Sequence, residues 1–472
     1  MGFSSKDLRQ AGWKPCPAFE VALEAARKAV KEKELGSKKE ARGLLQQVWA
    51  SPQAYVEHAV FGEAAEQLVK DRDRSGAVPL RDTPVEYTVW GRDWMDDATL
   101  KQMETAARLP VSVRGAQMPD GHLGYGLPIG GVLATRNVVI PYAVGVDIAC
   151  RVKLSVLPIE AAKLDNMRKD LVRALTEETA FGIGAKFPRG GQRYHEVLDD
   201  PAWEELPQEL KGLTSKAREQ LGSSGSGNHF VEWGEFVLEH PDLGLEPGRY
   251  LALFSHSGSR GFGAAVADYF TKVAQRKTWL PESARHLAWL ELDTPEGQAY
   301  WNAMNLAGRY AHANHECIHN EVLKHLRVKP ILEVENHHNF AWKEEHFGEE
   351  VIVHRKGATP AAAGELGMIP GTMADAGYLV RGKGNPESLN SAAHGAGRRM
   401  SRKKAKADLS KQQMREYLER RGVQLLSAGL DEAPMAYKNI RNVMDAQSDL
   451  VEIVAHFQPR IVRMAEGGPA ED

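Results

Sequence analysis

The sequence predicts a mixed α/β (α+β) protein with a helical extension at its N-terminus. Residues 1–82 contain charged, Ala-rich segments with helical periodicity. From residue 83 onward, short runs of apolar and β-branched residues are separated by Gly- and Pro-rich turns, as expected for strands. Long helix-forming segments interrupt these runs. We therefore expect two domains, a helical extension over 1–82 and a mixed α/β domain over 83–472.

Three segments of the extension are expected to be helices, Ala18–Lys33, Lys38–Val48 and Ser51–Val69. The following segment, Arg72–Pro84, mixes charged residues with Gly and Pro and is typical of a linker. The residues of the extension do not by themselves indicate a function.

The mixed domain begins with short strands and tight turns over Pro110–Cys150. The remaining elements are expected in the following order: a helix at Ala161–Leu175, a helix-prone polar segment at Asp200–Leu221, a strand that runs into a turn at Leu251–Arg260, helices at Ala264–Arg276 and Pro295–Leu326, strands at Ile331–Phe340 and Val351–His354, a loop at Gly357–Gly371, and helices at Gln412–Arg420 and Ile440–His456.

Composition excludes several classes of protein. The net charge of −3 gives no overall attraction to nucleic acid or to an anionic membrane, so a polyanion could be bound only by a local basic patch. The three cysteines are widely spaced, which indicates no disulfide framework and is typical of a reducing cytosol. The N-terminus has no apolar core of a signal peptide, and no window approaches the roughly 18 apolar residues of a membrane span. We expect a cytoplasmic protein without a membrane partner.

The segment Ile140–Arg151, with the sequence IPYAVGVDIACR, places Asp147 and Cys150 three residues apart. A carboxylate oxygen and a thiolate sulfur together are a mixed pair of donors for a divalent transition metal. In isolation, the segment fits a buried strand and a turn with a packed cysteine better. The histidines elsewhere in the chain reverse this preference.

Three further segments each place a histidine beside an apolar, strand-like run: His229 in GNHF, His256 in SHSGSR and His338 in NHHN. Singly, each would be a hydrogen-bonded turn residue. With Asp147 and Cys150 they supply enough donors for one metal with an open position, or for two metals that share the thiolate. This donor set favours Mn²⁺ or Zn²⁺ and does not distinguish between them.

His394 lies in the segment SAAHGAGRRMSR, directly before the flexible Gly395–Gly397. A basic cluster follows, formed by Arg398, Arg399, Arg402, Lys403 and Lys404. Such a histidine can attack a phosphate as a covalent nucleophile while the cations neutralise the phosphoryl oxygens. A loop that leads into a basic surface helix is an equally good interpretation of these residues alone.

The standard phosphate-binding motifs are absent from the sequence, because Gly124-Tyr125-Gly126 lacks the third glycine of a dinucleotide fingerprint and no segment matches a P-loop. The segment His315-Glu316-Cys317-Ile318-His319 is a literal HExxH, which on a helix presents two zinc ligands and a general base. Only Glu333 or Glu335 could supply a third ligand. We favour a solvent-exposed helix face for this motif.

Taken together, these segments resemble the RtcB family of RNA ligases. The matching motifs, in the order of the family, are MPDGHLGYGLPIGG, PYAVGVDIAC, GNHFVE, HSGSRGFG, NHHNFA, HRKGATPA, PGTM and HGAGRRMSR. The resemblance covers roughly Asp82 to Gly467 and leaves residues 1–82 largely outside. For this extension we favour a small helical cap over an arm that contacts RNA.

The resemblance implies a fold of the family's own type, with central β-sheets flanked by helices. It implies an RNA ligase that uses GTP and two Mn²⁺ ions to join 2′,3′-cyclic phosphate or 3′-phosphate ends to 5′-hydroxyl ends, in tRNA splicing or RNA repair. His394 would become guanylylated and pass GMP to the RNA 3′-phosphate. The implied metal ligands are Asp147, Cys150, His229, His256 and His338, with Cys150 bridging the two ions. The implied GMP site is lined by Asn228, His229, Phe230, Val231, Glu232, Asn339, Pro370, Gly371, Thr372, Met373, Gly395, Ala396 and Gly397.

Two positions depart from the family pattern. The family usually has a serine where this chain has Gly377, and a guanine-contacting lysine near its C-terminus where an ungapped alignment gives Met464, with Arg463 beside it. Both departures put guanine recognition in doubt. Two alternatives therefore stay open, a zinc hydrolase built on His315, Glu316 and His319, and a non-catalytic member that binds nucleotide or RNA. An archease-like activator is a further implied partner.

Overall fold

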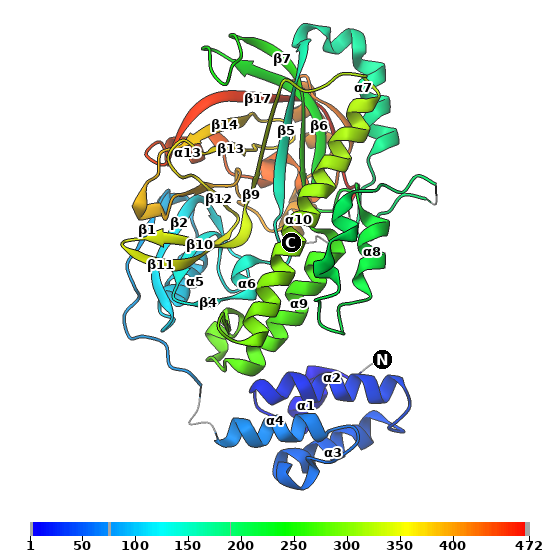
Figure 1. Ribbon diagram of the computed structural model, residues 1–472, viewed down its shortest axis with the longest axis vertical. Helices are drawn as coiled ribbons and strands as arrows, with labels where there is room; N and C mark the ends of the chain where they lie inside the picture. Colours follow the sequence, from blue (N-terminus) through cyan, green and yellow to red (C-terminus); the bar gives the residue numbers. More distant parts are fainter. Residues whose placement is uncertain (1–2, 74–76, 189, 468–472) are drawn as a thin grey trace.

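The computed structural model describes residues 3–73, 77–188 and 190–467, and its helices surround two large sheets (Figure 1). The α-helices are α1 (Ser5–Gln10), α2 (Pro17–Lys31), α3 (Lys38–Ala50), α4 (Gly62–Asp73), α5 (Asp97–Ala107), α6 (Pro141–Val144), α7 (Leu164–Glu178), α8 (Leu213–Gln220), α9 (Arg260–Lys277), α10 (Pro295–Lys324), α11 (Arg402–Asp408), α12 (Lys411–Glu419) and α13 (Ile440–Asp445). The short 3-10 helices used below are η1 (Pro52–Tyr55), η2 (Arg92–Trp94) and η3 (Ala161–Lys163).

The strands belong to two large sheets and two small ones. The first large sheet has the order β1-β2-β3-β11-β10, and the second has the order β13-β14-β17-β6-β7-β5-β9, with β16 paired to β17. The strand bounds are β1 (Tyr87–Val89), β2 (Ser112–His122), β3 (Ile129–Thr135), β4 (Val138–Val139), β5 (Arg151–Glu160), β6 (Phe230–Leu238), β7 (Gly248–Ser257), β8 (Leu290–Glu291), β9 (Leu332–His337), β10 (Asn339–His346), β11 (Glu349–Lys356), β12 (Ala358–Pro360), β13 (Leu366–Ile369), β14 (Gly377–Gly382), β15 (Ser391–Ala393), β16 (Gln424–Ser427) and β17 (Val451–Met464).

The predicted mixed fold with helices outside central sheets is confirmed. The helices α7 and α10 lie along one side of the second sheet in Figure 1, and α9 packs against α10. Buried Leu, Val and Trp side chains of β6 and β7 form a hydrophobic cluster with α7 and α10, which includes Trp233, Leu253 and Ile318. Burial of these apolar surfaces fixes the sheet against the helices. The second sheet is therefore a rigid support for residues at its ends.

The N-terminal helices α1–α4 enclose a hydrophobic cluster of their own, whose described members all lie between Phe3 and Leu68. They contact the rest of the chain through α9, where Lys272 Nζ lies 2.5 Å from Glu24 Oε1. Part of the expected linker, residues 74–76, lies outside the described residues, and residues 77–84 form neither helix nor strand. We propose that the boundary near residue 82 separates a small helical cap from the mixed domain.

The expected helix Ser51–Val69 is interrupted. The chain forms η1, turns, and begins α4 only at Gly62. The turn is held by His58, whose Nδ1 accepts hydrogen bonds from the backbone N–H of Val60 and of Phe61. A side chain at Gly62 would lie 2.7 Å from the carbonyl oxygen of Val56, so this close turn requires glycine.

Three other expectations are wrong. Residues 140–144 are not a strand, because Pro141 begins the short helix α6. The expected loop Gly357–Gly371 contains strands β12 and β13. The expected helix Ile440–His456 contains only α13, and the rest enters β17, which pairs with β14 on one side and β6 on the other. Tertiary pairing in the sheet outweighs local helix propensity there.

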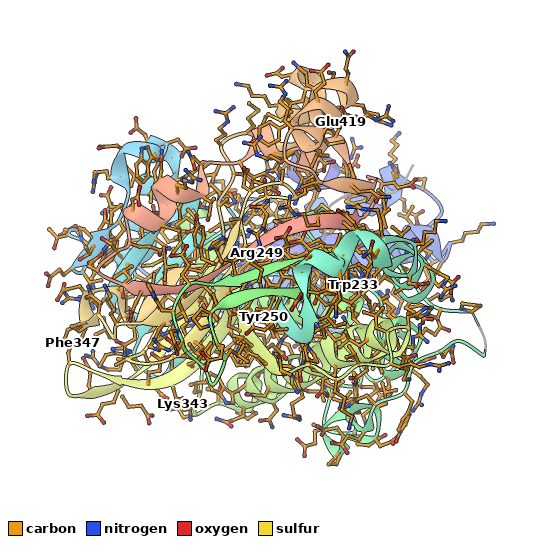
Figure 2. The ribbon with its side chains drawn as sticks, turned by 90° about the horizontal axis from the view of Figure 1, so that it is seen from above. Trp233, Arg249, Tyr250, Lys343, Phe347 and Glu419 are labelled. Carbon is orange, nitrogen blue, oxygen red and sulfur yellow. The ribbon has the colours of Figure 1, made fainter. Side chains whose placement is uncertain are left out.

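Figure 2 shows Phe347, at the tip of the β10–β11 hairpin, at the opposite side of the view from Trp233 of the second sheet. Among the described residues, none of the helices has both the length and the apolar composition to cross a bilayer.

Candidate functional site

Four strand ends of the second sheet meet at one point. Strand β5 pairs antiparallel with both β7 and β9, so that Arg151 lies opposite Ser257 and opposite His337. Strand β6 also pairs with β7, with Phe230 opposite His256. The start of β5, the start of β6 and the ends of β7 and β9 therefore lie at one edge. The predicted ligand residues occupy these ends, which explains why segments distant in the sequence converge.

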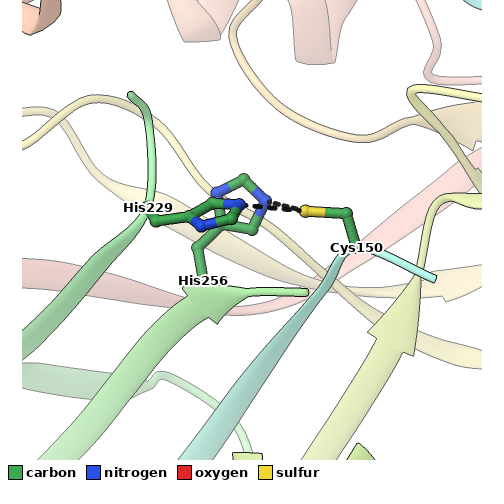
Figure 3. A group of neighbouring side chains, drawn as sticks. All are labelled: Cys150, His229 and His256. Carbon is green, nitrogen blue, oxygen red and sulfur yellow. Dashed lines mark hydrogen bonds between the residues drawn. The ribbon is translucent and has the colours of Figure 1, made fainter. Parts of the chain in front are cut away.

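All five predicted metal ligands lie together there. Cys150 Sγ is 3.4 Å from His229 Nε2 and 3.1 Å from His256 Nε2 (Figure 3). On one side of this group, His229 Nε2 is 3.1 Å from Asp147 Oδ2. On the other side, His256 Nε2 is 3.3 Å from His338 Nε2. Cys150 thus lies between two groups of candidate donors, Asp147 with His229 and His256 with His338.

The position of Asp147 is fixed by neighbouring loops. Its Oδ1 accepts a hydrogen bond of 3.1 Å from the backbone N–H of Ser259. A side chain at Gly258 would lie 2.2 Å from Asp147 Oδ2, so only glycine permits this approach. Asn339 Nδ2 donates to the Asp147 carbonyl at 3.1 Å. The carboxylate is therefore held in place before any ligand binds.

The chemistry of the cluster fits a cation. Burial lowers the pKa of both His256 and His338 well below 6.5, so that both imidazoles are neutral. Burial opposes ionisation of Asp147, but its hydrogen bond and charge interaction with His229 lower its pKa, so that it is a carboxylate. Imidazole nitrogens, a sulfur and a carboxylate oxygen gathered in one buried group are the donor atoms that Mn²⁺ and Zn²⁺ take in proteins. The residues therefore fit Mn²⁺ or Zn²⁺.

His394 lies next to this cluster, with its ring centroid 4.8 Å from that of His338. Its Nδ1 is 2.6 Å from Oδ2 of Asp120, and the same oxygen accepts from its backbone N–H at 3.1 Å. A carboxylate can only accept, so we assign the ring proton to Nδ1 and the lone pair to Nε2. Asp120 is fully buried, which strengthens this orientation. The ring of His394 is thus held in one orientation beside the cluster.

A cavity extends from the cluster and His394. We call it the nucleotide cavity. Its lining includes most of the residues expected to contact GMP: Asn228, His229, Phe230, Glu232, Asn339, Pro370, Gly371, Thr372, Met373, Gly395, Ala396 and Gly397. The exception is Val231, which packs with Trp233 in the cluster on the other face of the sheet, because successive side chains of a strand alternate.

Several residues of the site did not emerge from the sequence. His122 lines the cavity and Asp120 contacts His394; both lie in the quoted motif MPDGHLGYGLPIGG, where an acidic residue and a histidine two positions apart were the available signal. Burial lowers the pKa of His122 to about 4, so it is neutral. Glu432 and Tyr437 also line the cavity. The residues before Glu432 and Tyr437 are ordinary loop residues, and no local sequence pattern indicates a role for either side chain.

The basic cluster after His394 is partly neutralised by carboxylates. Arg398 lines the nucleotide cavity, and its Nη1 lies 3.3 Å from Glu432 Oε2. Arg402 pairs with Glu432 and with Asp431. Arg399 is exposed, and its Nε donates to the carbonyl oxygen of Met435. Only part of the expected positive charge therefore remains available to an anion.

The HExxH motif is buried, and the expectation of a solvent-exposed helix face is wrong for its two histidines. Ser255 Oγ lies 2.8 Å from both His315 Nδ1 and His319 Nε2, and His319 Nδ1 lies 2.8 Å from Ser155 Oγ. Glu316 instead faces His195 at 2.8 Å. In the described part of the chain these histidines belong to no group with metal-ligand geometry. They connect α10 to β5 and β7.

The two departures from the family pattern both lie at the nucleotide cavity, which is lined by Gly377 and Met464. Arg463 does not replace the expected lysine. Its Nη1 donates to the carbonyl oxygens of Leu175, Thr176 and Thr179 at the end of α7. Guanine would therefore meet a thioether where a cation is expected.

The fold and site define a class: a mixed α/β protein whose central sheet presents a cluster of candidate metal ligands and a carboxylate-oriented histidine to one cavity. The family profile described as tRNA-splicing ligase RtcB matches residues 102–465. The chain therefore belongs to the RtcB family.

Individual relatives agree with this assignment. The chain is 36% identical over 382 residues to the RNA-splicing ligase RtcB of Escherichia coli K12, covering 75% of this chain and 91% of that protein. It is 33% identical over 440 residues to the tRNA-splicing ligase RtcB of Thermococcus kodakarensis, covering 77% of this chain and 90% of that protein. It is 29% identical over 441 residues to RNA-splicing ligase RtcB homolog 2 of Entamoeba dispar, covering 77% and 83%.

Proposed function

We propose that this protein is a GTP- and Mn²⁺-dependent RNA ligase. It joins RNA that ends in a 2′,3′-cyclic phosphate or 3′-phosphate to RNA that begins with a 5′-hydroxyl, in tRNA splicing or RNA repair. Membership of a family whose relatives are named as RNA-splicing ligases supports the activity. The observation that carries the proposal is His394, oriented by Asp120 beside the five-residue cluster. We place the reaction in the cytoplasm.

In the first step, His394 Nε2 attacks the α-phosphorus of GTP, a phosphorus–nitrogen bond forms, and pyrophosphate leaves. Asp120 holds the proton on Nδ1 and stabilises the positive charge that develops on the ring. Manganese ions held by Asp147, Cys150, His229, His256 and His338 would supply charge neutralisation for the phosphates. Arg398, fixed by Glu432, would contact the phosphoryl oxygens.

The RNA 3′-phosphate then attacks the phosphorus carried by His394, and the imidazole leaves. The 5′-hydroxyl finally attacks the activated RNA phosphate and displaces GMP, so the phosphate of the RNA end remains in the joined strand. A 2′,3′-cyclic phosphate must first be opened by water to give the 3′-phosphate. Enclosure of the reacting groups in the cavity limits loss of GMP to water.

The test is covalent labelling with GTP that is radioactive at its α-phosphate, in the presence of Mn²⁺. We expect acid-labile label on the wild-type protein and none on His394→Ala. The matched control is His240→Ala, because His240 is an exposed histidine outside the cavity. Labelling that persists in His394→Ala would overturn the assignment of the nucleophile. Ligation measured with and without an archease-like protein shows whether an activator is needed.

A further inference from the structure

A second hollow lies beside the nucleotide cavity. We call it the end groove and define it by Trp94, Leu123, Tyr125, Tyr142, Arg399 and Lys438. His122, Asp147 and Asn339 line both the end groove and the nucleotide cavity. The groove therefore leads directly to the metal cluster and His394, and a chain that lies in it would present its terminus to the reacting atoms.

The end groove concentrates exposed apolar surface. Eight large hydrophobic side chains are exposed among the described residues, and three of them line this groove: Trp94 at 42%, Leu123 at 56% and Tyr125 at 65%. Such side chains are usually scattered singly, so a cluster beside a reactive centre indicates a binding surface.

The ring of Tyr125 is supported from the side. Tyr142 meets it edge-on with ring centroids 6.2 Å apart, and His286 meets it edge-on at 6.1 Å. Two edge contacts restrict rotation of the ring, while most of its surface stays open to solvent. A fixed and exposed aromatic ring can stack on a flat base with little loss of conformational entropy.

The groove also carries positive charge. Arg399 is exposed and, among the described residues, forms no ion pair with a carboxylate. Lys438 Nζ donates to the carbonyl oxygen of Gly121 at 2.6 Å. The carboxylates of the groove have other roles, because Asp96 caps α5 and Asp147 belongs to the metal cluster. In a chain with a net charge of −3, this local excess of cations favours a polyanion.

We propose that the end groove binds the terminal nucleotides of the single-stranded RNA that carries the 3′-phosphate. One base stacks on Tyr125, and Arg399 contacts a phosphate. Aromatic rings interleaved with cations are the surface that single-stranded nucleic acid requires, because the bases of a duplex are already stacked on each other. The phosphorylated end is favoured because it carries the additional negative charge and must reach His394 first. This inference rests on the proposed function.

The test measures binding of a short RNA with a 3′-phosphate and a fluorophore at its 5′ end. Tyr125→Ser is expected to weaken binding about tenfold, the usual effect of losing one base stack. Trp94→Ala, a second variant in the groove, is expected to weaken binding in the same direction. The matched control is Tyr194→Ser, since Tyr194 is 66% exposed and does not line the groove. Arg399→Gln should lower the slope of log affinity against log salt by about 0.7, one phosphate contact on a single strand.

Covalent labelling with GTP needs no RNA and therefore separates the two proposals. Absence of labelling in the wild-type protein overturns the proposed function, whatever the RNA affinities. If the wild type is labelled but Tyr125→Ser and Trp94→Ala bind RNA as it does, the end groove inference is overturned. A loss of affinity only for a strand with a 5′-hydroxyl and no 3′-phosphate overturns the choice of strand. Unchanged RNA affinity with loss of stimulation by an activator protein assigns the surface to a protein and also overturns the inference.

Discussion

Replacing Asp120 by Asn tests how His394 is prepared for attack. Asp120 Oδ2 accepts from His394 Nδ1 at 2.6 Å inside a fully buried environment. Asn keeps the shape of the side chain but removes its charge, and its NH₂ group can face the ring and favour the wrong tautomer. A hydrogen bond to a charged group contributes about 1.5–3 kcal/mol. This energy corresponds to a rate of GMP attachment that is about 10- to 150-fold lower.

The assay is single-turnover transfer of label from GTP to the protein at saturating Mn²⁺, with bound metal measured on the same samples. The control is Asp449→Asn, because Asp449 accepts from the ring N–H of Trp90 at 3.1 Å and does not line the nucleotide cavity. We expect the control to label at the wild-type rate. A rate for Asp120→Asn within twofold of wild type, with metal content unchanged, would refute the reasoning that Asp120 orients the nucleophile.

Four further predictions follow from the site. Cys150→Ser should lower the affinity for Mn²⁺ at least tenfold, because a shared ligand is lost. Cys317→Ser is the control and should leave the affinity unchanged, since Cys317 is a buried thiol away from the cluster. Equal affinities of the two variants in calorimetry would exclude Cys150 as a ligand. His319→Ala should leave the amount of bound metal unchanged. It should lower the free energy of unfolding, measured in urea, by about 2–4 kcal/mol, because the buried Ser155 and Ser255 lose their hydrogen-bond partner. Loss of metal from this variant would instead favour the zinc hydrolase alternative. Burial raises the pKa of Glu232 well above 4.5, so between pH 4.5 and this raised pKa the folded state binds a proton that the unfolded state does not. The free energy of unfolding is therefore expected to fall as the pH rises through this range. Urea midpoints of Glu232→Gln should lack this fall, and a pH dependence identical to that of the wild type would contradict the prediction. Met464→Lys should raise the preference for GTP over ATP in competitive labelling by about three- to tenfold, because the new lysine adds one hydrogen bond to the guanine base. An unchanged ratio of GTP to ATP labelling would place the guanine elsewhere.

The chemistry-bearing residues could be predicted from the sequence because their types and order are local properties. Asp147 and Cys150 fall in one short segment, and together with the three histidine segments they indicate a metal. Asp120 could not be assigned in the same way. Its role depends on a hydrogen bond to His394, 274 positions away, and nothing in its own segment indicates that partner. The Val231 side chain lies outside the cavity for a related reason, since only the pairing of β6 decides which of two neighbouring side chains faces it.

The buried HExxH histidines illustrate how the same local pattern can support a site without forming one. His315 and His319 bond to Ser255, and Ser255 directly precedes the proposed ligand His256 on β7. Because successive strand residues point to opposite faces, the serine faces α10 while His256 faces the metal cluster. The motif thus fixes one face of β7, and the opposite face of this strand carries the proposed ligand His256. A sequence pattern typical of a zinc site is explained here by the packing of a helix against the strand that carries the proposed ligand His256.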